Sequence, residues 1–79
     1  MGSPFEPTAL QRAENAIRDM FLGMQRRNEN VSVFEMDKVL SSPRWIRFYG
    51  KVALKTAWNN LVKEGYVHKH GNEWVWGLD

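Results

Sequence analysis

Apolar residues recur along the first third of the chain at the three- and four-residue spacing of one helix face. These residues are Leu10, Ala13, Ile17, Met20, Phe21 and Met24. Their spacing predicts a helix over residues 8–27. Thr8 is placed to cap this helix, because Gln11 follows three residues later in the pattern of a capping box. Two prolines disfavour helix within residues 1–7, so we expect an extended or disordered lead-in there.

A second, shorter helix is predicted over residues 33–41. Its apolar positions are Met36, Val39 and Leu40. Ser32 and Glu35 repeat the capping pattern that opens the first helix. Val31, just before this cap, is placed to pair with a later hairpin as a minimal strand.

The stretch 51–63 has two contrasting sides when it is wound at about 100° per residue. The apolar side consists of Leu54, Ala57, Trp58 and Leu61, with Val62 at its edge. The polar side consists of Lys55, Thr56, Asn59 and Lys63, with Asn60 at its margin. We expect the apolar side to be buried and the polar side to face water. Gly65 follows, where a helix typically ends in a left-handed residue.

Residues 66–76 alternate in the manner of a β-hairpin. Tyr66, His68 and His70 are expected on one face, with Val67 and Lys69 on the other. Trp74 and Trp76 share a face, which Val75 opposes. The pair Gly71-Asn72 predicts a two-residue turn, because both residues tolerate positive φ.

Residues 43–50 are predicted to form a helical turn or a short helix that ends at Gly50. Ser42 and Pro43 suit the cap and the first position of such a helix. We expect its large apolar residues to join the core, because a small chain needs the buried area. These residues are Trp45, Ile46 and Phe48. Arg44 and Arg47 would either meet phosphates beside residues 51–63 or lie over aromatic rings.

Composition narrows the class of protein. Seventy-nine residues make one small domain, and the absence of cysteine excludes disulfides and thiolate metal sites. That absence fits a cytoplasmic protein, and no apolar run approaches the roughly 20 residues of a membrane span. The net charge is only +2, but residues 44–69 hold six Lys or Arg against one acid. This asymmetry indicates one positive face.

The sequence does not predict an enzyme, a cofactor or a metal site. It has no glycine-rich phosphate loop, no GxSxG motif and no cysteine nucleophile. His68 and His70 are expected on the same strand face, but a stable metal site needs more ligands. Glu73 is the only acid near them.

The polar side of residues 51–63 carries the chemistry that duplex DNA requires. Asparagine can pair with adenine, threonine with a base edge or a thymine methyl, and lysine with guanine or phosphate. Solvated residues without a partner are the alternative interpretation. The candidate DNA-binding residues are Arg44, Arg47, Lys51, Lys55, Thr56, Asn59, Lys63, His68, Lys69 and His70.

The order of these parts resembles the winged helix-turn-helix family. The resemblance is carried by residues 31–40, as strand and second helix, and by residues 55–67, as third helix running into the wing. The ending Leu-Val-Lys-Glu-Gly-Tyr-Val over residues 61–67 is similar to one common in this family. The family's second and third helices are usually joined by a few residues, whereas residues 40–51 are a longer connection here.

The resemblance implies an α+β, mainly α fold over residues 8–79. It consists of a three-helix bundle and a C-terminal β-hairpin wing, with a short extra helical turn between helices 2 and 3. It also implies that the third helix enters the DNA major groove, where Lys55, Thr56 and Asn59 would read the bases.

We therefore expect a small intracellular DNA-binding domain, either a transcriptional regulator or part of a replication or mobile-element protein. A homodimer or a larger parent protein would raise its affinity for double-stranded DNA. The alternative is a winged-helix protein–protein interaction module without direct DNA contact. That module would use the aromatic residues within 45–49 or the hairpin tryptophans.

Overall fold

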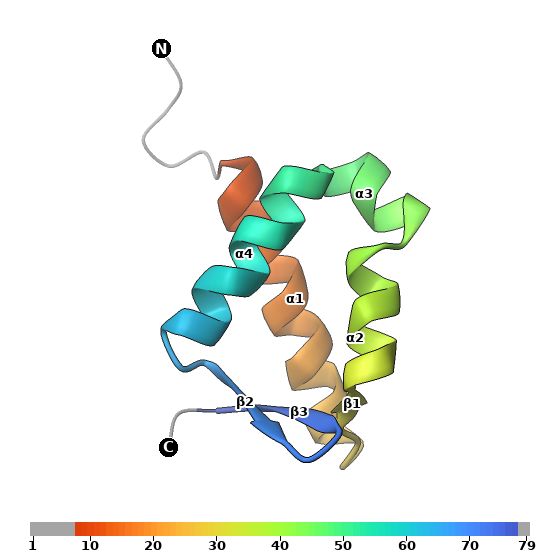
Figure 1. The fold of residues 1–79 in the computed structure, drawn as a ribbon, viewed down its shortest axis with the longest axis vertical. Coiled ribbons are helices and arrows are strands. Elements are labelled where there is room, and N and C mark those ends of the chain that lie inside the picture. The colour runs from red at the N-terminus through yellow and green to blue at the C-terminus, as the bar shows by residue number, and fades with distance from the viewer. Residues whose placement is uncertain (1–7, 78–79) are drawn as a thin grey trace.

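The computed structural model, which describes residues 8–77, has four helices and a small three-stranded sheet at the end of the molecule away from α3 (Figure 1). The elements in chain order are α1 (Ala9–Arg26), β1 (Val31–Ser32), α2 (Val33–Leu40), α3 (Pro43–Tyr49), α4 (Lys51–Lys63), β2 (Val67–His70) and β3 (Glu73–Trp76). The fold is α+β and mainly helical, as predicted, and its layout is compatible with a winged helix. The expected lead-in, residues 1–7, lies outside the described residues. Within residues 8–77, no helix is both long enough and apolar enough to cross a membrane.

Local hydrogen bonds set the ends of α1 where the sequence placed them. The Thr8 hydroxyl oxygen accepts a bond of 3.1 Å from the backbone N–H of Gln11, which confirms the predicted cap. After the last turn, Asn28 adopts a φ of 55°. The N–H of Glu29 then bonds to the Met24 carbonyl at 2.9 Å, as in a Schellman motif. These bonds satisfy backbone groups that the helix ends would otherwise leave unpaired.

The connection between α2 and α4 is a short helix, α3, and one of its expected caps is not formed. Ser32 caps α2 as predicted, accepting a bond of 3.0 Å from the N–H of Glu35. Pro43 occupies the first turn of α3, but the Ser42 side chain makes no capping hydrogen bond. Gly50 then turns the chain into α4 with a φ of 95°.

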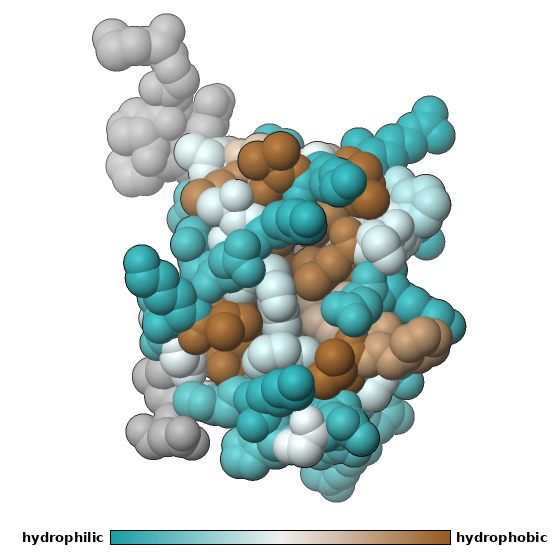
Figure 2. Space-filling view, viewed as in Figure 1, coloured by the Kyte–Doolittle hydropathy of each residue, from teal (hydrophilic) through white to brown (hydrophobic). Residues whose placement is uncertain are grey.

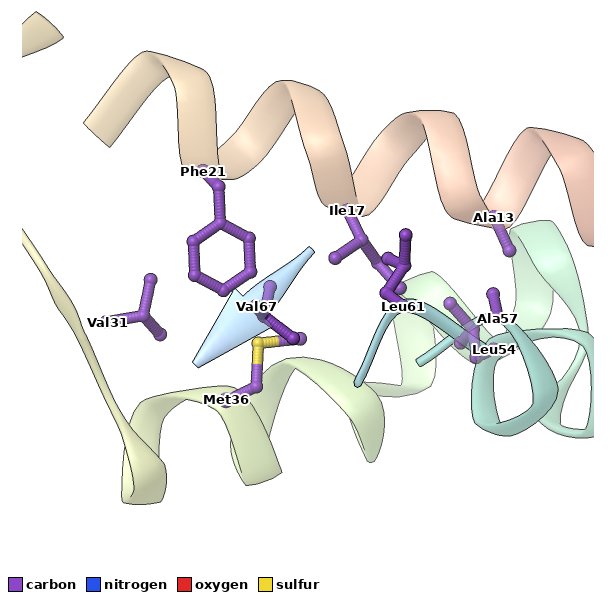
Figure 3. Close-up of a cluster of buried hydrophobic side chains, with 9 residues drawn as sticks. All are labelled: Ala13, Ile17, Phe21, Val31, Met36, Leu54, Ala57, Leu61 and Val67. Atoms are coloured by element: carbon purple, nitrogen blue, oxygen red, sulfur yellow. The ribbon is translucent and has the colours of Figure 1, made fainter. Parts of the chain in front are cut away.

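The core lies between α1 and α4 and extends toward the sheet (Figure 3). Its buried residues are Ala13, Ile17, Phe21, Val31, Met36, Leu54, Ala57, Leu61 and Val67. Ile17 and Leu61 lie in the middle of this cluster, with Phe21 toward the sheet. The stripes predicted for α1 and α4 are therefore confirmed.

One expectation about the core is wrong. Trp45 and Ile46 are half-buried and pack against the core, as predicted. Phe48, by contrast, is 76% exposed. At about 100° per residue the three apolar positions span about 160° of the helix, and Phe48, at one edge of this arc, lies outside the side that packs on the core.

The sheet is antiparallel in the order β1-β3-β2, and its register confirms the predicted minimal strand at Val31. Val31 pairs with Trp74, while His70 pairs with Glu73 across the turn. At the turn only Gly71 has a positive φ, 63°, which is the pattern of a type II′ turn. The predicted two-residue turn at Gly71-Asn72 is therefore confirmed.

The tryptophans of β3 pack against α1 and α4. Trp74 meets Trp58 of α4 edge to face, with 4.9 Å between ring centroids. Trp76 lies 5.7 Å from Phe21 of α1. The Gln25 side-chain amide also donates a bond of 2.7 Å to the Trp76 carbonyl. The hairpin is thus held against both α1 and α4.

A glycine substitution tests the end of α4. Gly65 has a φ of 82°, and the N–H of Tyr66 bonds to the Leu61 carbonyl at 2.9 Å. Gly65→Ala is expected to lower the free energy of unfolding by about 1–2 kcal/mol, because a Cβ disfavours the left-handed conformation. Urea unfolding followed by circular dichroism measures this change.

Gly23→Ala is the matched control. Gly23 lies inside α1, and a Cβ there would meet nothing within 4 Å, as at Gly65. Alanine at position 23 is expected to raise stability by about 0.5–1 kcal/mol, since glycine is unfavourable inside a helix. Equal effects of the two substitutions would contradict the role of Gly65.

Candidate nucleic-acid interface

The polar side of α4 faces solvent along the whole helix. We call this surface the α4 polar face, and its members are Lys55, Thr56, Asn59 and Lys63, all exposed. The opposite side is held in the core by Leu54, Ala57 and Leu61. Burial of the apolar side fixes the rotation of the helix, so the four polar residues must point outward.

The positive charges of this surface are not neutralised by acids in the described part of the chain. Among residues 8–77, the ion pair within 4.0 Å is Arg27–Glu29, at 3.3 Å. A polar contact to α1 does exist at the margin of α4, where the Asn60 amide donates to Glu14 at 3.4 Å. It leaves Lys55 and Lys63 available for an external anion.

A groove of about 750 Å³ runs beside the α4 polar face. We call it the α2–α4 groove, and its lining residues are Asp37, Leu40, Ser41, Ile46, Lys51, Lys55, Trp58 and Asn59. Figure 2 shows hydrophobic residues between α4 and α2, with hydrophilic residues on either side. The groove therefore combines an apolar lining with lysines and an amide from α4.

Asp37 gives this groove mixed electrostatics. Its exposed carboxylate comes from α2, whereas Lys51 and Lys55 come from α4. A phosphate within the groove would be attracted by the lysines and repelled by the carboxylate. The carboxylate itself is better matched by a base edge that carries a donor, because carboxylates accept from the cytosine amino group.

The wing divides its three candidate residues between two faces. Lys69 pairs with Trp74, so it shares the sheet face that packs on the helices. His68 and His70 point to the opposite face, where their ring centroids are 6.4 Å apart. Lys69 and His70 are exposed and His68 is half-buried. Of the three, Lys69 is the residue directed toward the α4 side.

The two arginines of α3 occupy a separate surface. Arg44 and Arg47 are exposed and line shallow hollows next to Phe48. No residue that lines these hollows also lines the α2–α4 groove. The ten candidates therefore lie on α4 and its groove, on the wing, and on α3.

Val52 is a surface residue of α4 that we did not predict. It is 78% exposed, although it is apolar. Val52 precedes Asn59 by seven residues, and such positions share a helix face. That spacing places Val52 on the same side of α4 as Asn59. Valine methyl groups suit contact with the thymine methyl group.

Comparison with known proteins adds no family to this description. The chain matches no protein-family model, no curated protein and no solved structure. Within the described residues 8–77, no three His, Cys, Asp or Glu side chains are grouped so that they could hold a metal ion.

Proposed function

We propose that the protein binds double-stranded DNA through α4, as a winged-helix domain. The observation that carries this proposal is the exposed α4 polar face, whose lysines have no acidic partner within 4.0 Å among the described residues. An α-helix fits the DNA major groove, which is about 12 Å wide. At about 1.5 Å per residue, the 13 residues of α4 reach across such a groove.

The residues of α4 divide into two roles in this proposal. Lys51, Lys55 and Lys63 supply affinity by neutralising phosphates, a contribution that salt weakens. Asn59 and Val52 contact base edges, and Thr56 adds a hydroxyl beside them. Lys69 extends the positive surface from the wing. The two histidines, on the far face of the sheet, are not needed for this contact.

The broader role follows from this contact. We propose a cytoplasmic transcriptional regulator, or part of a replication or mobile-element protein. One helix and one wing make few base contacts. A homodimer or a larger parent protein would raise the affinity for DNA by linking several DNA-binding sites in one assembly. A protein-interaction module is the second candidate, and the exposed Phe48 on α3 favours it.

Removal of two lysines tests the DNA proposal. Lys55→Ala with Lys63→Ala is expected to weaken duplex binding by about tenfold or more, since two phosphate contacts are lost. The slope of log affinity against log salt is expected to fall by about 2. Fluorescence anisotropy of a labelled duplex across a salt titration measures both quantities.

Two arginines of α1 provide a control with the same loss of charge. Arg12 and Arg26 are exposed on α1, which lies behind α4 in Figure 1. Arg12→Ala with Arg26→Ala is expected to leave the salt slope unchanged. Unaltered binding by the lysine variant, or equal losses from both pairs, would count against α4 as the DNA-binding element.

A further inference from the structure

The exposed aromatic residues of α3 form a second surface, distinct from the α4 polar face. Phe48 is 76% exposed and lies edge to face with Tyr49, with 4.9 Å between centroids. Tyr49 in turn lies 5.4 Å from Trp45. Three adjoining rings therefore reach the surface of one two-turn helix, with Phe48 outermost. Exposed aromatic side chains of this kind are typical of binding surfaces.

Phe48 lines two shallow hollows. One, of about 310 Å³, is lined by Arg44, Trp45, Phe48 and Tyr49. The other, of about 520 Å³, is lined by Pro43, Arg44, Arg47 and Phe48. Phe48 and Arg44 line both hollows. A partner side chain on either side of the Phe48 ring would therefore meet apolar surface and a guanidinium together.

The charge of this surface has one sign. No aspartate or glutamate occurs between residues 38 and 63, so α3 and α4 carry cations without acids. Neither arginine forms an ion pair within 4.0 Å in the described residues. Guanidinium groups pair with carboxylates in bidentate geometry. The surface thus offers apolar contact at its centre and arginine donors around it.

A second exposed phenylalanine shows how Phe48 differs. Phe34 on α2 is 66% exposed, but the Lys38 ammonium lies 4.5 Å from its ring centroid. That cation–π contact gives Phe34 a partner within its own helix. Phe34 also lines a hollow, and Phe48 also has a ring contact within its own helix, but among residues 8–77 no cation lies over the Phe48 ring, so its outer face is open to a partner.

We propose that the surface of Arg44, Trp45, Arg47, Phe48 and Tyr49, here named the α3 docking surface, binds an acidic segment of another protein. Apolar side chains of that segment would occupy the hollows beside Phe48, and its carboxylates would pair with the two arginines. Duplex nucleic acid fits less well, because its bases are paired inside the helix and its phosphates would satisfy the arginines but leave the apolar hollows unfilled. The proposal does not depend on DNA binding, since the α2–α4 groove shares no lining residue with this surface.

Selection of short random peptides on the immobilised 79-residue chain tests this proposal. We expect the selected peptides to be rich in Asp and Glu and to carry Leu or aromatic residues. Their affinity, measured by anisotropy with synthetic peptides, is expected to fall about tenfold or more with Phe48→Ala, as for an anchor residue at an interface. Arg44→Glu with Arg47→Glu is expected to have a similar effect through charge reversal.

Matched variants separate the surface from general effects. Phe34→Ala removes the same side chain from another exposed site and is expected to leave peptide affinity unchanged. Arg12→Glu with Arg26→Glu makes the same charge change on α1. All the substituted side chains are exposed, so we expect the variants to keep the unfolding midpoint of the original chain.

Several outcomes would overturn the proposal. One is that no peptides are selected, and another is that the selected peptides lack acidic residues. A third is that the peptides bind the Phe48→Ala variant and the original chain with equal affinity. Phe48-dependent binding to phosphatidylserine vesicles without peptide binding would assign the surface to anionic lipid instead. If Phe48→Ala weakened duplex DNA binding as much as peptide binding, the surface would belong to the DNA interface. Failure of the original chain to bind duplex DNA would leave the peptide result intact.

Discussion

Ile17→Ala is expected to lower the free energy of unfolding by about 3–4 kcal/mol, the range for large-to-small changes in a core. Ile17 is fully buried in α1 and lies in the middle of the core cluster, opposite Leu61 (Figure 3). Domains of this size are stable by only about 5–10 kcal/mol, so the variant would lose a large share of its stability. Urea unfolding followed by circular dichroism measures the loss.

Leu22→Ala is the control for this prediction. Leu22 also belongs to α1 but is 36% exposed, so its truncation leaves no cavity in the core. We expect a loss below about 1 kcal/mol, as for most surface substitutions. If Ile17→Ala cost no more than Leu22→Ala, the packing of α1 against α4 would have to be different from that described.

Trp58→Ala is expected to have the second large effect, a loss of about 3 kcal/mol. The Trp58 ring is parallel to Phe21 of α1, at 7° and 6.2 Å, and perpendicular to Trp74 of β3, at 89° and 4.9 Å. The same residue lines the α2–α4 groove. Removal of this side chain is therefore expected both to weaken the packing of the wing on α4 and to change the shape of the groove.

Two further tryptophan substitutions serve as controls for this prediction. Trp58→Phe keeps an aromatic ring between Phe21 and Trp74, so we expect less than half of the loss. Trp45→Ala removes a half-buried tryptophan whose ring meets Tyr49 on its own helix, and a smaller loss is expected. Thermal unfolding of the three variants, monitored by circular dichroism, gives the order. A Trp45→Ala loss equal to that of Trp58→Ala would refute the link between α4 and β3.

The helices and their ends could be predicted because the deciding interactions are local. The apolar stripe of α1 repeats over five turns, which leaves one face to bury. Thr8, Ser32, Gly65 and Gly71 act through their own conformation or through bonds three residues away, so sequence spacing alone identifies them. No knowledge of distant segments was required.

The surface of α3 could not be predicted for the opposite reason. Seven residues make two turns, and Trp45, Ile46 and Phe48 cover too much of the circumference for periodicity to choose an outer position. The choice depends on how α3 packs against α4, which is a tertiary property. The α2–α4 groove likewise depends on placing Asp37 beside residues of a helix that begins fourteen positions later.

The wing is an intermediate case. Alternation predicted that His68 and His70 would oppose Lys69, and the register agrees. Alternation does not say which face meets the helices. That choice follows from the contacts of Trp74 and Trp76 with Trp58 and Phe21, which bury the larger apolar area. The DNA-binding role of these residues stays a prediction.

The strand order β1-β3-β2 has a consequence for biosynthesis. Val31, made early, has its partner in Trp74, which the ribosome adds more than forty residues later. The helices can begin to associate on the nascent chain, but the sheet cannot close until β3 has emerged. Any polypeptide cut short before Glu73 would leave Val31 and Val67 without a neighbouring strand, a state prone to aggregation and to removal by proteases.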